Sequence, residues 1–372
     1  MNSNNKMRIL MLNYEFPPLG GGASPASYEI AKGYVKLGHS VDVVTMHYKG
    51  LPFFEVKDGI NIYRVKCLRK KKEICTTLEM LTYIISAKHF LKKHLKTNKY
   101  NINHTHFIIP TGIVALWAKK KFGIPYIITS HGSDVPGYNS DRFKLMHKFT
   151  KSIIRKVCIG AKIITAPSKS HINLIKAQIG KYPFAVIPYP MKDFLIKSLK
   201  KENIIISSGR LLPRKGFQYL IKAFESANLE GWKLYIIGDG PYKNELKSMA
   251  KNNPEIIFTG WLDNSSKKYK ELFNKSKIFS LLSSKETLGV VFQEAMSTKC
   301  AIISSNLSGC PETVGNTGSL VKPSDVSKVK EKLTYLVKNP KILKRYAKDA
   351  RKRYENVFSL KTVIPKYEDL IK

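Results

Sequence analysis

The strongest constraint on the fold is an alternation of short apolar runs with helical patterns along nearly the whole chain. Arg8 to Asn13 is an apolar run of strand length, a glycine-rich loop leads into a helix from Ala23 to Leu37, and Val41 to Thr45 is the next strand. A strand–helix–strand order predicts parallel strands joined by helices that cover the sheet. The pattern therefore predicts an α/β fold.

The alternation stops near Pro188 and Pro190 and starts again with an apolar run at 204–208. A chain of 372 residues is too long for one typical core, so we expect two α/β domains joined near residue 190. Other strands are expected at 60–65, 103–106, 125–129, 162–166, 185–188, 233–237, 255–259, 278–282 and 301–305, and other helices at 75–95, 111–122, 142–158, 168–179, 217–226, 290–296 and 342–372.

The net charge is extreme, because 64 lysines and arginines against 27 acidic residues leave +37. Such a field attracts an anionic membrane or nucleic acid, although biased genomic composition is an alternative source of the lysines. No apolar run reaches the roughly 18 residues of a membrane span, and the polar N-terminus leads directly into a strand, so neither a span nor a signal peptide is expected. The five scattered cysteines fit a reducing cytoplasm better than a disulfide framework.

The segment from Ser283 to Glu294 carries two carboxylates, Glu286 and Glu294, between a predicted strand and a predicted helix. Leu288 and Gly289 fall at the helix start, where backbone N–H groups lack partners and the helix dipole favours an anion. This arrangement suits a phosphate ester whose hydroxyl groups donate to the two carboxylates. Two solvated glutamates beside an ordinary helix are the alternative.

Other loops offer further phosphate-binding groups. Arg210 and Lys215 flank a turn before a helix, where a planar guanidinium and an ammonium suit a diphosphate; solvated surface cations are the alternative. Gly238 permits a close turn after the strand at 233–237. The Gly20–Gly22 loop lets a backbone approach a phosphate, but it matches neither the P-loop nor the dinucleotide-binding motif, and a plain tight turn is the alternative.

His131 stands at the carboxyl end of the strand at 125–129, next to Gly132 and three residues before Asp134. Open α/β sheets bind ligands at this end of their strands, so His131 is a candidate site residue, with a structural role as the alternative. His104 and His106 are weaker candidates. With no third ligand in the pattern, we predict no metal site.

The predicted helix at 75–95 follows a basic run at 69–72 and ends in several lysines. Such a helix can lie on an anionic membrane. Alternatively, it is a core helix whose terminal cations complement the helix dipole. Its apolar residues are Leu78, Leu81, Ile84, Ile85, Phe90 and Leu91.

Together these segments resemble the retaining glycosyltransferases of family four, which have the GT-B fold. The resemblance covers nearly the whole chain, and the order and separation of the motifs make it specific. It rests on Gly20–Gly22, His131–Asp134, Ser208–Gly216, Ile237–Pro241, Phe258–Trp261 and Glu286–Glu294 followed by Ala-Met.

The resemblance implies two Rossmann-like domains facing across a cleft. Residues 1–190 would bind the acceptor, residues 191–357 would bind a nucleotide-sugar donor such as a UDP- or GDP-sugar, and a helix at 358–372 would pack back on the first domain. The resemblance also implies that no metal or other cofactor is needed.

The resemblance assigns roles to individual residues in two groups. The reacting sugar and its leaving diphosphate would be contacted by His131, Glu286, Arg210 and Lys215. Gly21 and Gly22 would touch the same diphosphate from the opposite domain, the Leu288 and Gly289 N–H groups would lie near the sugar, and Glu294 would bind the ribose hydroxyl groups. Gly238, Trp261 and Leu262 would complete the donor site, with base contacts from the turn that begins at Trp261.

Three positions depart from the family pattern. Tyr189-Pro190 stands where Asn-Gly is usual, and Ser308 stands where the first glycine of a loop is usual. Thr298-Lys299 replaces another glycine, at a cost of about 1 kcal/mol if the backbone there is left-handed.

We therefore predict a retaining, metal-independent hexosyltransferase that acts on a lipid-linked or polysaccharide-precursor acceptor. It would be cytoplasmic and peripheral on the inner face of an anionic membrane, with no specific nucleic-acid partner. Two alternatives are a nucleotide-sugar epimerase of the same fold, which would need no acceptor, and a non-catalytic binder of membrane or nucleic acid. The donor base, the sugar, the acceptor and the linkage do not follow from the sequence.

Overall fold

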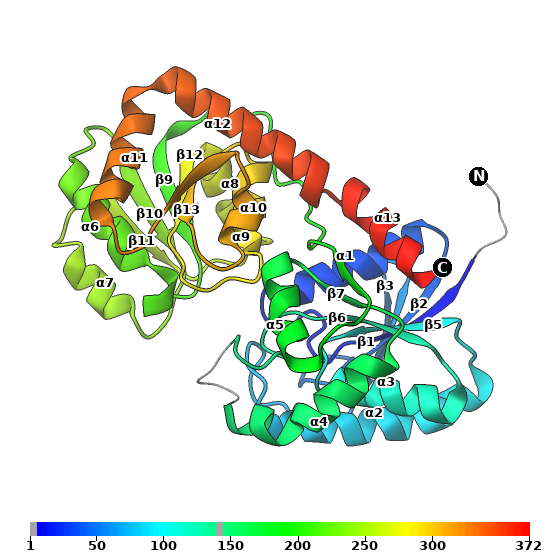
Figure 1. Cartoon of the computed structure of the whole chain (residues 1–372). Coiled ribbons are helices and arrows are strands. Elements are labelled where there is room, and N and C mark those ends of the chain that lie inside the picture. Colours follow the sequence, from blue (N-terminus) through cyan, green and yellow to red (C-terminus); the bar gives the residue numbers. More distant parts are fainter. Residues whose placement is uncertain (1–5, 139–143) are drawn as a thin grey trace. The chain divides into compact units, whose positions relative to one another are not determined.

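The computed structural model describes residues 6–138 and 144–372 and divides into two compact units (Figure 1). Unit 1 comprises Met1–Pro190 with Leu360–Lys372, and unit 2 comprises Met191–Ser359. The first break coincides with the boundary predicted at residue 190, and the second lies at 360 rather than at 358. The acceptor and donor roles assigned to the two domains stay predictions.

Unit 1 contains an eight-stranded sheet with the order β3-β4-β2-β1-β5-β6-β7-β8. Its strands pair in parallel, except that β3 and β4 are antiparallel at one edge. The chain builds outward from β1 on one side and restarts beside β1 with β5. The strands are β1 Arg8–Leu12, β2 Ser40–Met46, β3 Phe54–Lys57, β4 Ile60–Val65, β5 Ile102–His106, β6 Tyr126–Thr129, β7 Ile164–Ala166 and β8 Phe184–Val186.

Side chains of these strands enter two separate cores, because successive residues of a strand point to opposite faces of the sheet. Leu10 and Leu12 of β1 belong to one core, and Ile9 and Met11 belong to the other. Helices α2 to α5 contribute to the first core and helices α1 and α13 to the second. These helices are α1 Ala23–Lys36, α2 Thr77–Thr97, α3 Thr111–Phe122, α4 Lys144–Gly160, α5 Lys169–Ile179 and α13 Leu360–Ile371.

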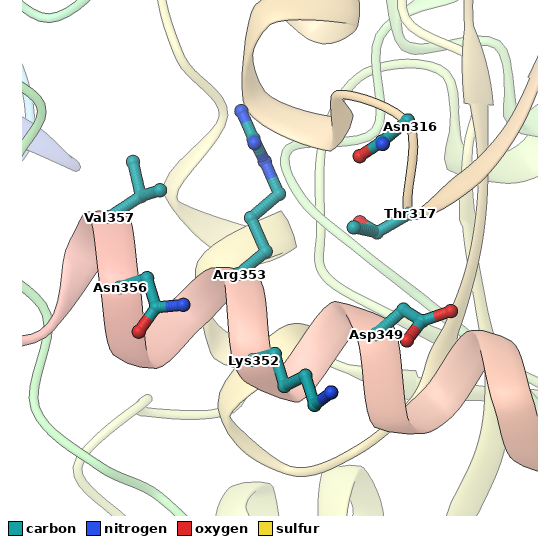
Figure 2. Close-up of a pocket in the computed structure, with 7 residues that line it drawn as sticks. All are labelled: Asn316, Thr317, Asp349, Lys352, Arg353, Asn356 and Val357. Atoms are coloured by element: carbon teal, nitrogen blue, oxygen red, sulfur yellow. The ribbon is translucent and has the colours of Figure 1, made fainter.

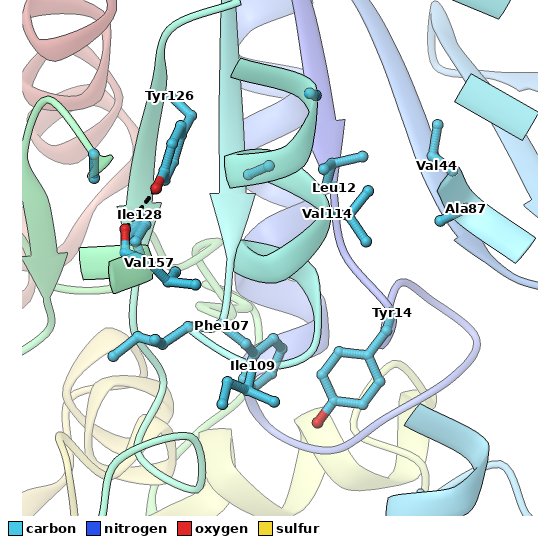
Figure 3. Close-up of a cluster of buried hydrophobic side chains, with 14 of the residues drawn as sticks. Leu12, Tyr14, Val44, Ala87, Phe107, Ile109, Val114, Tyr126, Ile128 and Val157 are labelled. Carbon is cyan, nitrogen blue, oxygen red and sulfur yellow. Dashed lines mark hydrogen bonds between the residues drawn. The ribbon is translucent and has the colours of Figure 1, made fainter. Parts of the chain in front are cut away.

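Figure 3 shows part of the first core, where side chains of strands and covering helices meet. Tyr126 brings a hydroxyl group into this apolar region. That hydroxyl donates to the backbone carbonyl of Val157 in α4 at 2.5 Å. The hydrogen bond removes the cost of burying an unpaired polar group and ties β6 to α4.

The C-terminal helix α13 belongs to unit 1, as the resemblance implied for the last helix. It contacts α1, and its side chains Val363, Ile364 and Tyr367 are buried in the second core. Gly33 of α1 lies directly under Ile364, and a β-carbon at Gly33 would be 2.5 Å from Ile364 Cδ1. Glycine at this helical position therefore permits the close packing of the two helices.

Unit 2 contains a six-stranded parallel sheet with the order β11-β10-β9-β12-β13-β14. The chain runs from β9 to one edge and returns to the other side of β9 with β12. The strands are β9 Glu202–Ser208, β10 Lys233–Ile237, β11 Ile256–Gly260, β12 Ser276–Leu281, β13 Ala301–Ser305 and β14 Gly318–Val321.

In unit 2, α6 packs against α7 and α11, while α12 packs against α9 and β13. A π-helical turn, η2 Tyr354–Phe358, and extended Ser359 interrupt the helix predicted over 342–372. The helices are a 3-10 turn η1 Pro213–Lys215, α6 Phe217–Ala227, α7 Lys243–Met249, α8 Lys267–Lys275, α9 Val290–Ser297, α10 Cys310–Val314, α11 Val326–Lys338 and α12 Pro340–Arg353.

The predicted α/β class with two largely parallel sheets is confirmed, and the predicted elements are found within a few residues of their expected places. The start of the helix predicted at 142–158 lies outside the described residues. Two strands and four α-helices were not predicted: β3, β14, α7, α8, α10 and α11. Edge strand β3 exposes Phe54 and Val56, α8 and α11 are rich in lysine, and the other three are short, so their apolar patterns are weak.

Helix α2 has both a buried face and an exposed apolar strip. The residues buried in the unit 1 core are Met80, Tyr83, Ala87, Leu91 and Leu95, which confirms the core-helix interpretation for that face. Leu78, Leu81 and Ile85 are instead 62%, 53% and 70% exposed. None of the helices in the described part of the chain has the length and apolar character needed to cross a bilayer.

Replacing Gly33 by alanine tests the packing of α13. Alanine normally stabilises a helix interior by about 1 kcal/mol relative to glycine. Here the new methyl group would lie between 2.5 and 2.8 Å from three carbons of Ile364. We expect the cost of overpacking to exceed the gain in helix propensity. Gly33→Ala should therefore lower the free energy of unfolding by about 1–3 kcal/mol in urea titrations.

The matched control is the double variant Gly33→Ala/Ile364→Ala. Truncating Ile364 makes room for the new methyl group, so the two losses should be clearly less than additive. A Gly33→Ala protein that is more stable than the wild type would contradict the close helix contact.

Candidate functional site

The carboxyl ends of β9 and β12 form the switch point of the unit 2 sheet, because the chain continues in opposite directions from these two neighbouring strands. Open α/β sheets bind ligands in the crevice outside such a point. The segments after these two strands carry Arg210, Lys215, Glu286 and Glu294. The topology therefore brings four predicted site residues to one edge of one sheet.

The loops after β9 and β12 meet at Gly216. This residue has a φ of 75°, and a β-carbon there would lie 2.1 Å from the carbonyl oxygen of Leu282. Beside this contact, the backbone N–H of Ser284 donates to the carbonyl of Arg214 at 2.8 Å. Only glycine combines this backbone conformation with so close an approach. The contact places Lys215 next to the second loop.

Lys215 and Glu286 form an ion pair across these two loops. The Lys215 ammonium donates to Glu286 Oε1, and the two side chains are only 16% and 9% exposed. Arg210 is exposed and makes no ion pair with any residue of the described ranges. Of the two predicted cations, Lys215 is paired and the charge of Arg210 is not neutralised by a described residue, which favours an anionic ligand.

The loop that carries Glu286 is supported from behind by the segment 308–313. The Gly309 N–H and the Ser308 hydroxyl donate to the Glu286 carbonyl at 3.0 and 2.7 Å, and the Thr313 hydroxyl donates to the Leu288 carbonyl. Ser308 has a φ of 55°, the left-handed backbone that the glycine usual in the family adopts easily. Its side-chain hydrogen bond offsets this conformational cost.

Leu288 and Gly289 precede α9, so their predicted place at a helix start is confirmed. Gly289 is the N-cap with a φ of 73°, and Leu288 is buried. The first N–H groups of a helix have no partner within it and lie at the positive end of its dipole. The end of the Glu286 loop thus offers backbone donors to an anion.

Glu294 lies in α9 with its carboxylate buried. Its Oε2 accepts a hydrogen bond from the Tyr269 hydroxyl at 2.7 Å, and that hydroxyl lies 3.2 Å from Ser208 Oγ at the end of β9. Burial raises the pKa of Glu294 to about 7, although hydrogen bonds from Tyr269 and Asn264 oppose the rise. Glu294 therefore changes its protonation state near neutral pH.

Gly238 and the turn after β11 complete this edge. Gly238 has a φ of 141°, and a β-carbon there would lie 2.0 Å from the Gly209 carbonyl, so glycine is required where the two loops cross. Trp261 is 70% exposed and Leu262 is half-buried. Because Asn264 of the same turn bonds to Glu294, the exposed indole belongs to the segment that adjoins this carboxylate.

The Gly20–Gly22 loop follows β1 at the switch point of the unit 1 sheet. Gly20 has a φ of 93°, and a β-carbon there would lie 2.6 Å from Glu15 Cβ. Gly21 and Gly22 lack a left-handed φ, and a β-carbon on either would meet no described atom within 4 Å. The backbone conformation and the close contact therefore require glycine at position 20. Neither requirement applies at positions 21 and 22, where the backbone is accessible.

His131 lies two residues after the end of β6 and is 7% exposed. Its Nδ1 is 2.8 Å from the Tyr189 hydroxyl, and its Nε2 is 2.9 Å from Nδ1 of His106. Asp134 contacts the backbone and not the ring, because its Oδ1 accepts from the His131 and Gly132 N–H groups. Burial lowers the pKa of His131 to about 4, so the ring is neutral at neutral pH. Its contact with a sugar stays a prediction.

Two departures from the family pattern now have a structural explanation. Tyr189, in place of the usual asparagine, supplies the hydroxyl group that binds His131. Lys299, just after α9, has a φ of 61°, so the left-handed backbone expected there is present at the cost of about 1 kcal/mol stated above.

No group of three or more His, Cys, Asp or Glu side chains in the described ranges could hold a metal ion. A pocket of about 410 Å³ lies away from these loops, between the end of α12 and the turn before β14 (Figure 2). It is lined by Asn316, Thr317, Asp349, Lys352, Arg353, Asn356 and Val357, none of them a predicted site residue. Arg353 donates to the carbonyls of Glu312 and Thr313, which indicates a structural role for that side chain.

The contacts that hold the candidate groups in place were not predicted from the sequence. Tyr269 and Asn264 hold Glu294, whereas Tyr189 and His106 hold His131. The contact of His106, itself a weaker candidate from the sequence, could have been predicted, because His106 ends the strand next to the one that His131 follows. Tyr269 reaches Glu294 from α8, and no local pattern in the sequence signals that contact.

Residues 192–353 match the profile of the family described as glycosyl transferases group 1. Residues 20–191 match the profile described as glycosyltransferase family 4. The two matches meet at the junction of units 1 and 2, and each covers most of one unit.

Individual proteins are similar over most of the chain. N-acetyl-alpha-D-glucosaminyl L-malate synthase of Bacillus anthracis is 26% identical over 95% of this chain and 94% of its own length. GDP-mannose-dependent monoacylated alpha-(1-6)-phosphatidylinositol monomannoside mannosyltransferase of Corynebacterium glutamicum is 28% identical over 62% and 65%. Anabaena HepE, solved in complex with UDP, has a TM-score of 0.77 at 16% identity over 98% and 99%, which shows a shared fold.

The buried carboxylate of Glu294 predicts an unusual dependence of stability on pH. The pKa of about 7 in the folded chain exceeds the ordinary value of 4.5, so the folded chain binds the proton more tightly. The free energy of unfolding should therefore fall as pH rises from about 4.5 to about 7. We expect Glu294→Gln to exceed the wild type by on the order of 3 kcal/mol above pH 7, and to match it below about pH 4.5, in thermal unfolding.

Glu286→Gln is the matched control, because it removes a carboxylate from the same loop–helix segment but leaves Lys215 without its partner. That variant should gain no stability above neutral pH. A Glu294→Gln protein that is less stable than the wild type at every pH would contradict a carboxylate buried at a cost.

Proposed function

The chain belongs to the group 1 glycosyltransferases of family 4 and has the GT-B fold, and from this we propose that it transfers a hexosyl group from a nucleotide sugar with retention of configuration. The proposed acceptor is a lipid-linked or polysaccharide-precursor molecule at the inner face of a membrane. The observation that carries the proposal is the convergence of Lys215, Glu286 and the start of α9 at the switch point of unit 2.

Arg210 and Lys215 would bind the donor diphosphate. In the transfer step the bond between the sugar C1 and the phosphate oxygen breaks, and a bond from C1 to an acceptor oxygen forms. The acceptor proton would pass to the leaving phosphate. Negative charge grows on the diphosphate during this step, and the two cations with the α9 N–H groups would stabilise it. These cations supply the charge that a divalent metal provides in other enzymes, so we propose a metal-independent reaction.

The other unit 2 residues would bind the remaining parts of the donor. Glu286 would accept hydrogen bonds from the sugar hydroxyl groups once the diphosphate competes for Lys215. Glu294, as a carboxylate, would accept from the ribose hydroxyl groups. Trp261 and Leu262 lie on the turn that adjoins Glu294, which supports base contacts from that turn. Gly238 would allow the donor to approach the backbone between β9 and β10.

Unit 1 would contribute Gly21, Gly22 and His131. The open backbone of the two glycines supports close approach of a phosphate, as expected from the sequence. His131 would face the reacting sugar as a neutral ring, held by Tyr189 and His106. Both ring nitrogens have partners in the fold, so a hydrogen bond from His131 to a sugar hydroxyl would replace its contact with Tyr189 or His106, and the neutral ring would add no charge near C1.

The acceptor proposal rests on two observations. The Corynebacterium relative is named for a phosphatidylinositol mannoside acceptor, and the charge of this chain is +37. A strongly basic protein concentrates at the anionic inner surface of a membrane, where a lipid-linked acceptor is found. We therefore propose a cytoplasmic protein that associates peripherally with that surface.

Nucleotide binding tests this function directly. Titration calorimetry with UDP, GDP, ADP and CMP should show selective binding of one nucleoside diphosphate. Arg210→Ala should weaken that binding by about ten- to a hundredfold, because one charge-assisted contact to the diphosphate is lost.

Arg345→Ala is the matched control, because Arg345 is an exposed arginine on α12 of the same unit. It should leave the dissociation constant unchanged. The donor site is contradicted if no nucleoside diphosphate binds or if both variants weaken binding equally. Conversion of a nucleotide sugar to an epimer without any acceptor would support the epimerase alternative.

Alanine substitutions in the Gly20–Gly22 loop separate folding from function. Gly21→Ala and Gly22→Ala should keep or slightly raise stability, since neither position is strained, but should reduce the transfer rate about tenfold or more by crowding the phosphate. Gly20→Ala should instead lower stability by about 1–2 kcal/mol, because its φ of 93° disfavours a side chain. Thermal unfolding and steady-state transfer assays measure the two effects; full activity in both Gly21→Ala and Gly22→Ala would contradict the assigned role.

A further inference from the structure

The segment after β4 and the first turns of α2 form an exposed surface of unit 1 that folding leaves unexplained. We call it the α2 patch and define it as Leu68, Lys70–Lys72, Leu78, Leu81 and Ile85. Its four apolar residues are 54%, 62%, 53% and 70% exposed, in chain order. Leu78, Leu81 and Ile85 recur at helical spacing, so they share one side of α2, which lies on the same face of the sheet as α3 and α4 (Figure 1).

The loop of the α2 patch is fastened to the helix by hydrogen bonds. The Leu68 N–H donates to Thr82 Oγ1 at 3.1 Å, and the Lys70 N–H donates to Glu79 Oε1 at 2.7 Å. The Ser86 hydroxyl donates to the Lys66 carbonyl at 2.5 Å. Thr82, Glu79 and Ser86 of α2 are therefore turned toward the loop, and the exposed strip beside them is apolar.

Arg69 keeps the neighbouring lysines exposed. Its guanidinium donates to the carbonyls of Lys71 and Lys72 at 2.8 and 2.9 Å and lies 3.7 Å from Glu15, with none of the side chain exposed. The arginine thus anchors the loop from inside. Lys70, Lys71 and Lys72 are left at the surface.

We infer that the α2 patch docks on an anionic lipid bilayer. Residues 66–96 carry nine basic and two acidic side chains, a net charge of +7, so the region is attracted to negative charge. The exposed leucines and isoleucine distinguish the bilayer from nucleic acid, because a phosphate backbone gives them nothing to bury against, whereas the acyl region does. A cationic rim around protruding apolar side chains matches the order of head groups and acyl chains.

The docking surface adjoins the candidate site of unit 1. β4 runs parallel to β2 and β1, so the loop after β4 lies at the same edge of the sheet as the Gly20–Gly22 loop. The Gly20 N–H donates to the Lys72 carbonyl at 2.8 Å and joins the two loops directly. Resting on the proposed function, this contact implies that the acceptor head group is taken from the bilayer surface beside the glycine loop.

Sedimentation with phospholipid vesicles tests the inference, without any nucleotide present. The wild type should bind vesicles that contain phosphatidylglycerol, bind those of phosphatidylcholine far less, and bind less as salt rises. Lys70→Glu/Lys71→Glu/Lys72→Glu should weaken binding by about a hundredfold or more. Leu78→Ser/Leu81→Ser/Ile85→Ser, which keeps the charge, should weaken it by about tenfold.

The matched control is Lys341→Glu/Lys344→Glu/Lys348→Glu, which reverses three exposed lysines on α12 of unit 2. It changes the net charge equally and should leave vesicle binding within about threefold of the wild type. Thermal unfolding and nucleotide binding of all variants should match the wild type, which shows that they fold.

Three outcomes would overturn the inference. The first is equal loss of vesicle binding in the control, which would assign the attraction to net charge. The second is unchanged binding in the Leu78/Leu81/Ile85 variant, and the third is binding of DNA or RNA but not of anionic vesicles. Vesicle binding without nucleotide binding would support the docking surface and contradict the transferase proposal. Nucleotide binding without vesicle binding would support the transferase proposal and contradict the docking surface.

Discussion

The contact between the Gly216 backbone and the Leu282 carbonyl is the constraint on which the site of unit 2 depends. Two loops that follow neighbouring strands can bring Lys215 and Glu286 together only if their backbones nearly touch. Any side chain at position 216 would collide with the second loop, and its left-handed φ also favours glycine. A second crossing, Gly238 over Gly209, arranges the neighbouring loop in the same way. The geometry of this edge therefore depends on the glycines at positions 216 and 238 as well as on its charged side chains.

Burial favours the neutral form of two titrating groups of the candidate site. Glu294 has a pKa of about 7 because it is buried against Tyr269, and His131 has a pKa of about 4 because it is buried between Tyr189 and His106. Both groups are satisfied by hydrogen bonds that reach them from other segments. Burying these two ionisable groups does not stabilise the folded chain. Buried groups with shifted pKa values are concentrated at functional sites, so the pH dependence of Glu294 bears on function as well as on folding.

The sequence predicted the fold class, both parallel sheets and most elements, because strand-length apolar runs and helical spacing are local signals. It also predicted that the loops with the candidate residues lie together at one edge of each sheet, because parallel strands place all their carboxyl ends at one edge. It failed for β3, α8 and α11, whose apolar patterns are weak, and for Tyr269, whose contact with Glu294 joins α8 to α9. For α2 the core-helix interpretation is confirmed for one face, whereas membrane contact of the exposed apolar strip stays a prediction.

By itself the sequence determined the order of strands and helices, the excess of positive charge and the identity of the polar groups at the strand ends. Backbone propensity and side-chain periodicity act over a few residues, so a linear reading captures them. Only the tertiary structure decided that Lys215 pairs with Glu286, that Tyr189 and His106 hold His131, and that the loop after β4 is fastened to α2 beside Gly20. Such contacts join residues far apart in the chain, and their geometry depends on how two sheets and their helices pack.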